Sequence, residues 1–579
     1  MVAVEEKKRA QSWLDSNIDE SAKAEIRRMM ANENPEELVD SFYQNLEFGT
    51  GGLRGIMGTG SNRVNKYTIG MATQGLANYL KKSFPYEKIS VAIAYDSRNN
   101  SQYFGEMTAA VFSANGIHVY LFEELRPTPE LSFTIRTLGC KSGVVLTASH
   151  NPKEYNGYKA YWDDGGQVVA PHDKNIIAEV NKIAGPDEVN FQADENLITR
   201  IGENLDNKYL TAVAGNVVTP EAIANQKDLK IVYSSIHGTG ITMVPRILEK
   251  LGFTNVHVVK EQATPDGNFP TVVYPNPEET EAMSIALKQA KDLDADLVMA
   301  TDPDADRVGI GVKNPHGEWQ LLNGNQTGSL IIYYLLKQWK AKGKLDGKQY
   351  VCKTIVTTDL IDRMADRFGV DCINTLTGFK WIAEVLRENE GKRQFIGGGE
   401  ESYGYLIGDF VRDKDAISSC AMIAELVAYA KDNGLTLFDL LTEIYLTFGM
   451  YLERLFSIKK GGKKGQEEIA ELMAQMRTNP PKEIEGSPVV TLLDYQRQIR
   501  TDLTSGEELP IDMPKSNVLQ FLTADGTKVS ARPSGTEPKI KFYMSVNTPM
   551  ARKEDFDSTL AKLNQKIDGI QVLIDEYTR

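Results

Sequence analysis

Short apolar runs alternate with amphipathic stretches of helical period through most of this chain. Strands are expected at apolar runs that include residues 89–95, 143–146, 229–233, 297–300, 350–356 and 393–396. Between these runs, apolar residues recur with helical spacing, most clearly at residues 280–293 and 359–368. This alternation of strand and helix signals is typical of α/β architecture.

The expected strands come in three successive pairs, and each strand ends in polar or glycine-rich residues. VAIAYDSR is followed by GVVLTASHNP, IVYSSIHGTG by LVMATDPDADR, and VCKTIVTTD by FIGGGEES. No strict sequence period links the pairs, so the repetition is one of architecture. We expect three α/β domains of similar plan, with ligand-binding groups at the carboxyl ends of the strands, where open α/β sheets usually bind.

The pattern changes after about residue 461. A helix is expected at residues 467–476, a proline-rich connector at 479–487, and strands near 518–523 and 539–546. We interpret this segment as a separate, fourth domain. The expected domains cover residues 1–210, 211–325, 326–455 and 456–579.

Length and composition agree with this organisation. At about 150 residues per domain, 579 residues suggest about four domains. A content of 41% hydrophobic and 25% charged residues can form several buried cores. The 65 Lys and Arg residues are outnumbered by 79 Asp and Glu residues, and the net charge of −14 argues against nucleic acid or an anionic membrane as the main partner. An anionic ligand would need positive charge that is gathered locally.

The cysteines and the N-terminal segment indicate the compartment. The four cysteines form no C-x-x-C pair and are too few for a disulfide framework, so free thiols in a reducing compartment are expected. The segment MVAVEEKKRAQSWLD is charged and lacks the apolar core of a signal peptide. No apolar run approaches the ~18 residues needed to cross a bilayer. We expect a soluble, cytoplasmic protein.

Ser149 stands in the run TASHNP, directly after an expected strand. A serine at a strand end, on a polar turn closed by proline, is exposed and positioned. His150 beside it suggests acyl transfer, but neighbours on a turn need not face each other, and no G-x-S-x-G elbow occurs. One alternative is a serine that carries a phosphoryl group, since phosphate monoesters hydrolyse extremely slowly in water. The other is a turn serine that only bonds the backbone.

A second polar run, DPDADR, follows the apolar run LVMAT. Carboxylates at alternate positions, Asp302, Asp304 and Asp306, can converge on one hard cation such as Mg²⁺ or Ca²⁺. A calcium EF-hand needs Gly and Glu where this chain has Arg307 and Lys313, so that motif is excluded. Three protein oxygens leave room for a phosphate oxygen on Mg²⁺. An acidic, solvated turn is the alternative.

Three further runs offer polar groups to a ligand. RPSGTEPK supplies a bidentate cation, hydroxyls and backbone N–H groups around a tight turn, which is the composition of a phosphate cradle. GEESYG offers carboxylates and a hydroxyl to sugar hydroxyls, and GTGGLRG is a glycine-rich loop with one cation. Each alone could be a surface turn. Nucleotide binding loses its main support, because neither G-x-x-x-x-G-K-[ST] nor a complete G-x-G-x-x-G occurs.

TASHNP, DPDADR, GEES and RPSGT occur in this order along nearly the whole chain, each at an expected strand-to-loop junction. Together they resemble the α-D-phosphohexomutase family, which includes the phosphoglucomutases and phosphomannomutases. GEESYG is closer to the phosphoglucomutases, and TLTGFK and RPSGTEPK look like the branch that also contains phosphopentomutases. The resemblance implies three similar α/β domains with mixed sheets and a smaller α+β C-terminal domain, arranged around a central cleft.

The resemblance also implies roles for individual residues. Ser149 would be the phosphoserine, and Asp302, Asp304 and Asp306 would hold Mg²⁺ together with its phosphate. The residues expected to bind the sugar phosphate are Thr377, Gly378, Glu400, Ser402, Arg412, Lys414, Arg532, Ser534, Gly535, Thr536 and Lys539. The residues expected to assist the reaction are His150, Lys159, Lys380, Arg54 and Arg307. Either lysine among these could move a proton or be a fixed charge on substrate phosphate.

The implied reaction is reversible phosphoryl transfer between O1 and O6 of glucose. It would convert glucose 1-phosphate and glucose 6-phosphate through a phosphoserine enzyme, with glucose 1,6-bisphosphate as intermediate and activator. Mannose and pentose phosphates stay open as substrates, because a few hydrogen bonds separate them. A haloacid-dehalogenase-like enzyme with an aspartyl phosphate on Asp302 is an alternative, although its motif requires Thr or Val at the position of Asp306. A non-catalytic sugar-phosphate sensor should have lost Ser149 or an aspartate.

Overall fold

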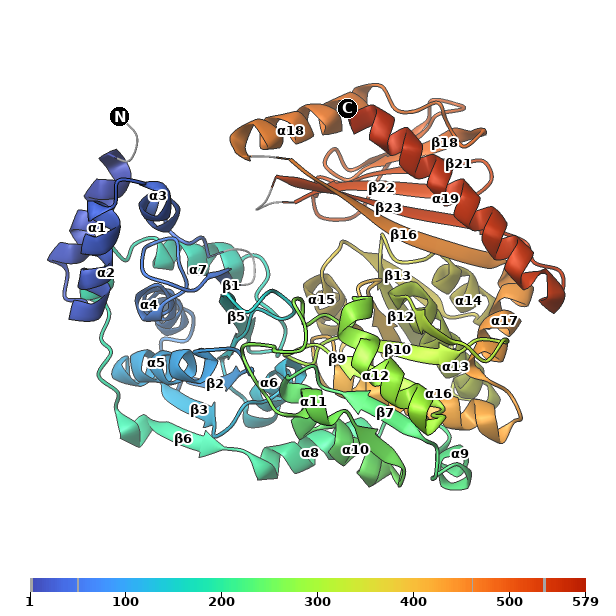
Figure 1. Cartoon of the computed structure of the whole chain (residues 1–579), viewed down its shortest axis with the longest axis horizontal. Helices are drawn as coiled ribbons and strands as arrows, with labels where there is room; N and C mark the ends of the chain where they lie inside the picture. The colour runs from blue at the N-terminus through green and yellow to red at the C-terminus, as the bar shows by residue number, and fades with distance from the viewer. Residues whose placement is uncertain (1–3, 49–51, 461, 535–537, 579) are drawn as a thin grey trace.

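The computed structural model describes residues 4–48, 52–460, 462–534 and 538–578. They form four sheets with flanking helices, and the C-terminal sheet lies above the third sheet in the view of Figure 1. The N-terminal helices α1 (Val4–Asp15), α2 (Glu20–Ala31) and α3 (Glu36–Phe42) pack around Trp13 and Phe42. The sequence patterns above did not predict this N-terminal cluster.

The first sheet is mixed. Its strands are β1 (Gly52–Ile56), β2 (Ser90–Tyr95), β3 (His118–Phe122), β4 (Ser142–Leu146), β5 (Tyr155–Trp162) and β6 (Ile198–Ile201), in the spatial order β1-β5-β4-β2-β3-β6. The four strands β4-β2-β3-β6 are parallel, whereas β5 is antiparallel to β4 and to β1. Small and β-branched apolar residues fill the buried β2 and β4, as central strands covered on both faces require. The covering helices are α4 (Lys66–Ser83), α5 (Ser101–Ala114), α6 (Thr128–Leu138) and α7 (His172–Val180).

The second and third sheets repeat this mixed design. The second contains β7 (Ile231–Ser234), β8 (Val256–Val258), β9 (Leu297–Thr301), β10 (Val308–Lys313) and β11 (Trp319–Leu322), in the order β11-β10-β9-β7-β8. The third contains β12 (Gln349–Thr354), β13 (Asp371–Thr375), β14 (Gln394–Gly399) and β15 (Tyr405–Ile407), in the order β13-β12-β14-β15. The associated helices are α8 (Glu203–Ala214), α9 (Pro220–Asn225), α10 (Val244–Leu251), α12 (Thr280–Leu293), α13 (Gly324–Ala341), α14 (Leu360–Phe368), α15 (Phe379–Asn389), α16 (Ala416–Asp432) and α17 (Leu437–Phe448).

Each of these three sheets carries its polar run at the same kind of connection. TASHNP lies between β4 and β5, DPDADR between β9 and β10, and GEES leads from β14 to β15. In every case the earlier strand has one parallel neighbour, and the later strand is antiparallel to it. Each run therefore sits where a parallel strand ends and the chain turns back. Three α/β domains with mixed sheets are confirmed.

The C-terminal sheet is antiparallel. It contains β16 (Met450–Lys459), β18 (Ser487–Asp494), β19 (Ile499–Asp502), β20 (Glu508–Pro510), β21 (Leu519–Thr523), β22 (Lys528–Pro533) and β23 (Lys539–Thr548), and the short β17 (Glu483–Ile484) pairs with β18. The helices α18 (Gly462–Thr478) and α19 (Phe556–Thr578) pack against β23. The expected α+β domain is confirmed. The expected connector 479–487 was wrong in part, because it contains β17 and the first residue of β18.

Within the described residues, one hydrophobic cluster extends through the second, third and fourth sheets, whereas the first sheet has separate clusters. The helix α16 is buried along most of its length and contacts both β9 and β15, so it joins the second sheet to the third. The expected domain boundaries stay predictions. Those near 210 and 455 fall inside α8 and β16, so a division that keeps elements whole would shift them by several residues.

The expected helix at 280–293 has the bounds of α12, but the expected strand at 350–356 is too long. β12 ends at Thr354, although the Ile355 N–H still donates to the Thr375 carbonyl at 2.8 Å. The side chains of Ile355 and Val356 pack with Tyr495 and Val518 of the C-terminal domain. The apolar run continues past the strand because these two residues serve an interface between domains.

The cysteines and helices add two observations. Cys140, Cys352, Cys372 and Cys420 are unpaired. Among the described helices, none combines the length and the apolar character that crossing a membrane requires.

Candidate active site

A polar cleft of about 1160 Å³ receives residues from all four sheets. Ser149 reaches it from the first sheet, Asp306 from the second, Glu400 from the third and Arg532 from the fourth. The loops at the ends of three α/β sheets therefore meet at one cavity, opposite the C-terminal sheet. The volume exceeds the roughly 1,000 Å³ that is the usual upper limit for small-molecule sites, and the expected central cleft is present.

Ser149 is held against the first aspartate of the second domain. Its hydroxyl donates to Asp302 Oδ2 at 2.9 Å, and His150 Nδ1 lies 3.1 Å from the same hydroxyl oxygen. The backbone of Ser149 is left-handed, with φ at 52°, which a residue with a side chain adopts only where its surroundings impose it. The Ser149 N–H donates to Thr147 Oγ1 at 2.8 Å. The run TASHNP thus presents one hydroxyl, on a constrained turn, to the acidic loop.

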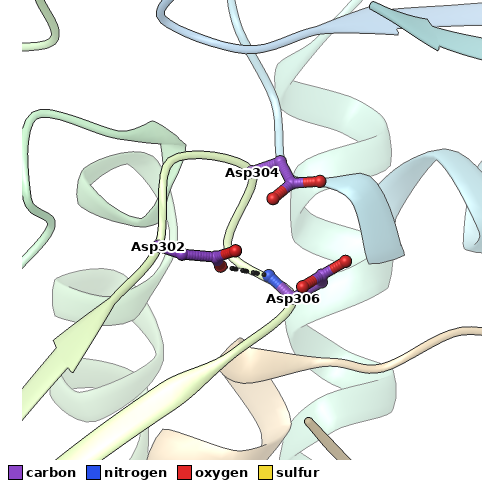
Figure 2. Close-up of side chains that lie close together, drawn as sticks. All are labelled: Asp302, Asp304 and Asp306. Atoms are coloured by element: carbon purple, nitrogen blue, oxygen red, sulfur yellow. Dashed lines mark hydrogen bonds between the residues drawn. The ribbon is translucent and has the colours of Figure 1, made fainter. Parts of the chain in front are cut away.

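Asp302, Asp304 and Asp306 form an acidic cluster between β9 and β10 (Figure 2). Each residue is at most 1% exposed, and each offers a carboxylate oxygen within 4.8 Å of the others. Asp302 Oδ1 accepts the N–H of Asp306 at 3.1 Å and the N–H of Arg307 at 3.0 Å. Ala305, left-handed at a φ of 50°, turns the loop between them. The alternate carboxylates are thereby brought together.

The cluster leaves oxygens free for a cation. In the described part of the chain, Asp304 Oδ1 and Asp306 Oδ1 are buried and have no hydrogen-bond partner. Burial, and then the charges of Asp306 and Asp304, raise the pKa of Asp302 well above its usual range. Oxygen donors of this kind suit a hard divalent cation, whose charge would offset their repulsion. The residues fit the Mg²⁺ that the family resemblance implies.

Basic side chains surround the acidic cluster. Lys159 Nζ lies 2.7 Å from Asp304 Oδ2 and 3.4 Å from Asp306 Oδ2, and Lys414 Nζ lies 3.2 Å from Asp306 Oδ2. Burial alone would lower the pKa of Lys159, but Asp304 and then Asp306 outweigh burial, and the pKa is raised. Lys159 is therefore a cation at neutral pH. Positive charge is gathered locally, as an anionic ligand requires in a chain of net charge −14.

Arg54, Arg307 and His150 also line the cleft. Arg307 Nη1 donates to Glu278 Oε1 at 2.7 Å, and Arg54 Nη1 donates to Asn151 Oδ1 at 3.1 Å. Burial, and then the charges of Arg307 and Arg54, lower the pKa of His150 well below its usual range. The imidazole beside the serine is therefore neutral at pH 7.

Lys380, Thr377 and Gly378 line the cleft from the turn TLTGFK, before α15. Burial lowers the pKa of Lys380, and its Nζ lies 4.9 Å from the ring centroid of Trp381. Lys380 therefore releases a proton more readily than Lys159, whose pKa is raised.

Glu400 and Ser402 line the cleft beside this turn. Glu400 Oε1 accepts the Gly378 N–H at 3.0 Å, which ties two loops of the third sheet together. Burial raises the pKa of Glu400 to about 7, although the nearby charge of Lys414 opposes the rise. Glu401 raises this pKa further, and Arg307 acts in the opposite direction.

We expect the pH dependence of kcat/KM to follow the ionisation of the Glu400 carboxyl. Its carboxylate can accept bonds from two sugar hydroxyls, whereas protonation below its pKa of about 7 removes one acceptor. The value of kcat/KM, which reports ionisations of the free enzyme, should therefore rise about tenfold between roughly pH 6 and pH 8. The variant Glu400→Gln should lack this inflection. Ionisation of the substrate phosphate is common to both proteins and acts as an internal control, and an unchanged inflection in the variant would assign it to another group.

The cleft face of the C-terminal sheet is basic. Arg532 on β22 lies directly opposite Lys541 on β23, and Lys539 is two residues before Lys541 on the same face. Burial, and then Lys539 and Arg532, lower the pKa of Lys541, because neighbouring positive charges oppose its protonation. Ser534 donates its N–H to the Lys539 carbonyl at 2.7 Å. An anion would relieve the repulsion, so this face suits a phosphate group.

Arg412, like Ser534, is an expected substrate-binding residue that does not line the cleft. The buried guanidinium of Arg412 lies 3.2 Å from Glu390 Oε1 and bonds carbonyls of its own loop. Its backbone N–H donates to Ser132 Oγ of the first domain at 2.8 Å. The substrate contact of Arg412 stays a prediction, and its side chain is held by residues of its own domain instead of lining the cavity. Gly535 and Thr536 lie outside the described residues.

Some cleft residues were not predicted from the sequence. Lys541 could have been found from the alternation in KIKFYM, which places residues 539, 541 and 543 on one face of a strand. Tyr274 and Glu278 line the cleft from the segment YPNPEET, before α12, which carries no recognisable motif.

A serine held against a buried acidic cluster, facing a basic sheet across a polar cleft, defines an enzyme of phosphoryl transfer. Family profiles described as phosphoglucomutase/phosphomannomutase alpha/beta/alpha domains I, II and III match residues 45–186, 207–317 and 323–448. The chain belongs to this phosphoglucomutase/phosphomannomutase family, whose members are mutases that act on sugar phosphates.

Relatives with known names are similar in sequence over nearly the whole length of the chain. A phosphoglucomutase of Staphylococcus haemolyticus is 38% identical over 506 residues, which are 87% of this chain and 91% of the relative. A phosphoglucomutase of Staphylococcus epidermidis is 36% identical over 560 residues, 96% and 99% of the two chains.

Solved structures share the fold. The phosphoglucomutase parafusin from Paramecium, in an open form, is 17% identical with a TM-score of 0.67, over 92% of this chain and 95% of that chain. A family protein from Burkholderia thailandensis is 17% identical with a TM-score of 0.64, over 90% and 97%.

Proposed function

We propose that this chain is a phosphoglucomutase, which interconverts glucose 1-phosphate and glucose 6-phosphate. The 2.9 Å contact between the Ser149 hydroxyl and Asp302, at a cleft lined by all four domains, carries the proposal. The relatives that are 38% and 36% identical are both named phosphoglucomutase, which supports glucose as the sugar.

Ser149 would act as a phosphoryl relay. Phosphorylated Ser149 gives its group to O6 of bound glucose 1-phosphate: the serine O–P bond breaks, the O6–P bond forms, and the O6 proton passes to the freed serine oxygen through an acid–base group. The resulting glucose 1,6-bisphosphate turns over in the cleft, so that its O1 phosphate faces the serine. The O1–P bond then breaks and the serine O–P bond re-forms, the proton of the serine hydroxyl ends on O1, and glucose 6-phosphate leaves. Free Ser149 would be recharged by added glucose 1,6-bisphosphate, which is why the bisphosphate is an activator.

The acidic cluster would hold Mg²⁺ through Asp302, Asp304 and Asp306, with the phosphate on Ser149 as a further ligand. The bound ion supplies Lewis-acid stabilisation of charge on the transferred group. The guanidinium groups of Arg54 and Arg307 suit phosphate oxygens. Alignment and neutralisation of charge are what phosphoryl transfer mainly requires of a protein.

The proton of the attacking hydroxyl needs an acceptor. His150 is neutral, because its pKa is lowered, and it lies 3.1 Å from Ser149 Oγ, so it could take and return a proton there. Lys380, with its lowered pKa, could do the same at the far side of the substrate. Lys159 is assigned a fixed charge, because the aspartates raise its pKa.

The remaining cleft residues would hold the substrate in two poses. Glu400 and Ser402, with Thr377 and Gly378, face the space where sugar hydroxyls would lie. The basic face of the C-terminal sheet would hold the non-reacting phosphate through Arg532, Lys539 and Lys541. The sequence motif adds Ser534, Gly535 and Thr536 to this proposal, and the last two lie outside the described residues. Lys414, paired with Asp306, would add positive charge near the run GEES.

The proposal is tested by comparing sugar 1-phosphates at equal concentration, with Mg²⁺ and the matching bisphosphate present. Glucose 1-phosphate should give the highest kcat/KM, and mass spectrometry should find one phosphate on Ser149. Higher kcat/KM for mannose 1-phosphate or ribose 1-phosphate would assign the alternative substrates. A phosphate that hydroxylamine removes, mapped to Asp302, would assign the aspartyl-phosphate mechanism instead.

We place the enzyme in the cytoplasm, with small sugar phosphates as its partners. The unpaired Cys140, Cys352 and Cys420 are buried and suit a reducing compartment.

A further inference from the structure

Arg98 lies beneath the serine loop, the segment of residues 147–155 that carries Ser149, and it does not line the cleft. It follows β2, in the run YDSR, and is 3% exposed. Its Nη2 donates to the carbonyls of Ser149, at 2.5 Å, and Asn151. Its Nη1 donates to the carbonyls of Pro152, at 2.8 Å, and Tyr155, at 3.1 Å. One guanidinium therefore fastens the backbone of the loop at four places.

Asp96 holds the other side of the same loop. Its Oδ2 accepts the Thr147 hydroxyl at 2.6 Å, and Thr147 Oγ1 accepts the Ser149 N–H at 2.8 Å. Asp96 Oδ1 accepts the Arg98 N–H at 2.9 Å, and its Oδ2 lies 3.4 Å from Arg98 Nε. Both the N–H and the carbonyl of Ser149 are thus fixed, and its left-handed φ of 52° is imposed from both sides.

The second domain covers the same guanidinium. The ring centroid of Phe269 lies 5.1 Å from Arg98 Cζ, and Phe269 is 2% exposed. Beside it, Asn99 Nδ2 donates to Asn268 Oδ1 at 3.1 Å. A Cβ added to Gly267 would lie 2.1 Å from the Asn99 backbone nitrogen, so the two loops approach as closely as glycine allows. Arg98 is therefore contacted by the domain that carries the acidic cluster.

We propose that Arg98 is a positioning residue, which fixes Ser149 Oγ at its contact with Asp302. The inference rests on the proposed function, in which Ser149 is the phosphoryl relay. A planar guanidinium can reach several carbonyls at once in a fixed fork, whereas the ammonium of lysine cannot reproduce that fork. Because misplacing a reacting group by about 1 Å costs roughly 10²-fold in rate, the backbone clamp should matter to turnover more than to binding.

The test compares Arg98→Lys with the wild-type protein. We expect kcat to fall about 10²-fold, with KM within about threefold, when kcat is counted per chain that accepts phosphate on Ser149. Hydrogen–deuterium exchange at the amides of residues 147–155 should become about tenfold faster. Arg477→Lys is the matched control: Arg477 is a half-buried arginine of the C-terminal domain that bonds Asp494 and Asn517 and lies outside the cleft lining. Both readouts should be unchanged there.

The two readouts separate this inference from the proposed function. Unchanged exchange in Arg98→Lys would overturn the inference, whatever the activity. Faster exchange with an unchanged kcat per phosphorylatable chain would make Arg98 a stabilising residue only, which also overturns it. Absence of turnover and of phosphoserine in the wild-type protein would instead refute the proposed function, and the positioning role would fall with it.

Discussion

Replacing Ser149 with alanine is expected to reduce turnover of glucose 1-phosphate by at least about 10⁴-fold, the scale of loss when a nucleophile is removed. The reason is chemical: alanine offers no oxygen to carry the phosphoryl group, and the neighbouring Asp302 carboxylate is part of the acidic cluster. Binding should change little, because the proposed sugar and phosphate contacts belong to Glu400, Arg532 and Lys541. Steady-state turnover and calorimetric affinity for glucose 6-phosphate would measure the two effects.

The control for this variant is Ser113→Ala. Ser113 is a buried serine on α5 that bonds the carbonyl of Ala110 and lies outside the cleft lining. It should keep full turnover. If Ser149→Ala turned over at the rate of this control, or took up phosphate from labelled glucose 1,6-bisphosphate, Ser149 would not be the relay.

Replacing Asp306 with asparagine is expected to abolish stabilisation by Mg²⁺ and to lower kcat by about 10²-fold or more. The wild-type protein should gain about 2.7 kcal/mol of unfolding free energy when Mg²⁺ is present at 100 times its dissociation constant. In Asp306→Asn one buried carboxylate is lost, and the orphaned Asp306 Oδ1 is no longer a charged ligand. Thermal unfolding with and without Mg²⁺ measures this effect independently of activity.

Asp294→Asn serves as the comparison. Asp294 is an exposed aspartate of the same domain, paired with Lys313 at 2.5 Å. Its variant should keep the full Mg²⁺-dependent shift. An equal shift in Asp306→Asn would show that Mg²⁺ binds elsewhere, and chelation that left wild-type turnover intact would remove the metal from the mechanism.

Much of the fold could be predicted because its signals are local. Fully apolar runs between polar turns gave the central strands of three sheets, and α12 has a clear helical period. The local sequence pattern failed to predict elements whose ends or existence are determined by tertiary contacts. Ile355 and Val356 continue the apolar run of β12 without continuing the strand, since they pack against the C-terminal domain. The small N-terminal helices depend likewise on packing around Trp13.

The candidate site could be predicted in its residue types but not in all of its contacts. The runs around Ser149 and Asp302 follow strands, so their meeting at one edge follows from α/β topology. The position of Arg412 does not follow from the topology, because it depends on contacts with Ser132 and Glu390, which are distant in sequence. Arg98 was equally hidden: its partners are backbone carbonyls, which carry no sequence signal.

The three similar connections, in which a strand ends and the chain turns back into an antiparallel strand, determine how the cleft can be remodelled. Each of the three runs spans a connection whose two strands are secured by their own sheet. An insertion or graft at GEES would reshape one wall of the cavity and leave the registers of β14 and β15, and the other two walls, in place. In the proposed function, selectivity for the sugar and the chemistry of transfer are thus assigned to separable parts, which a designer or natural selection can alter one at a time.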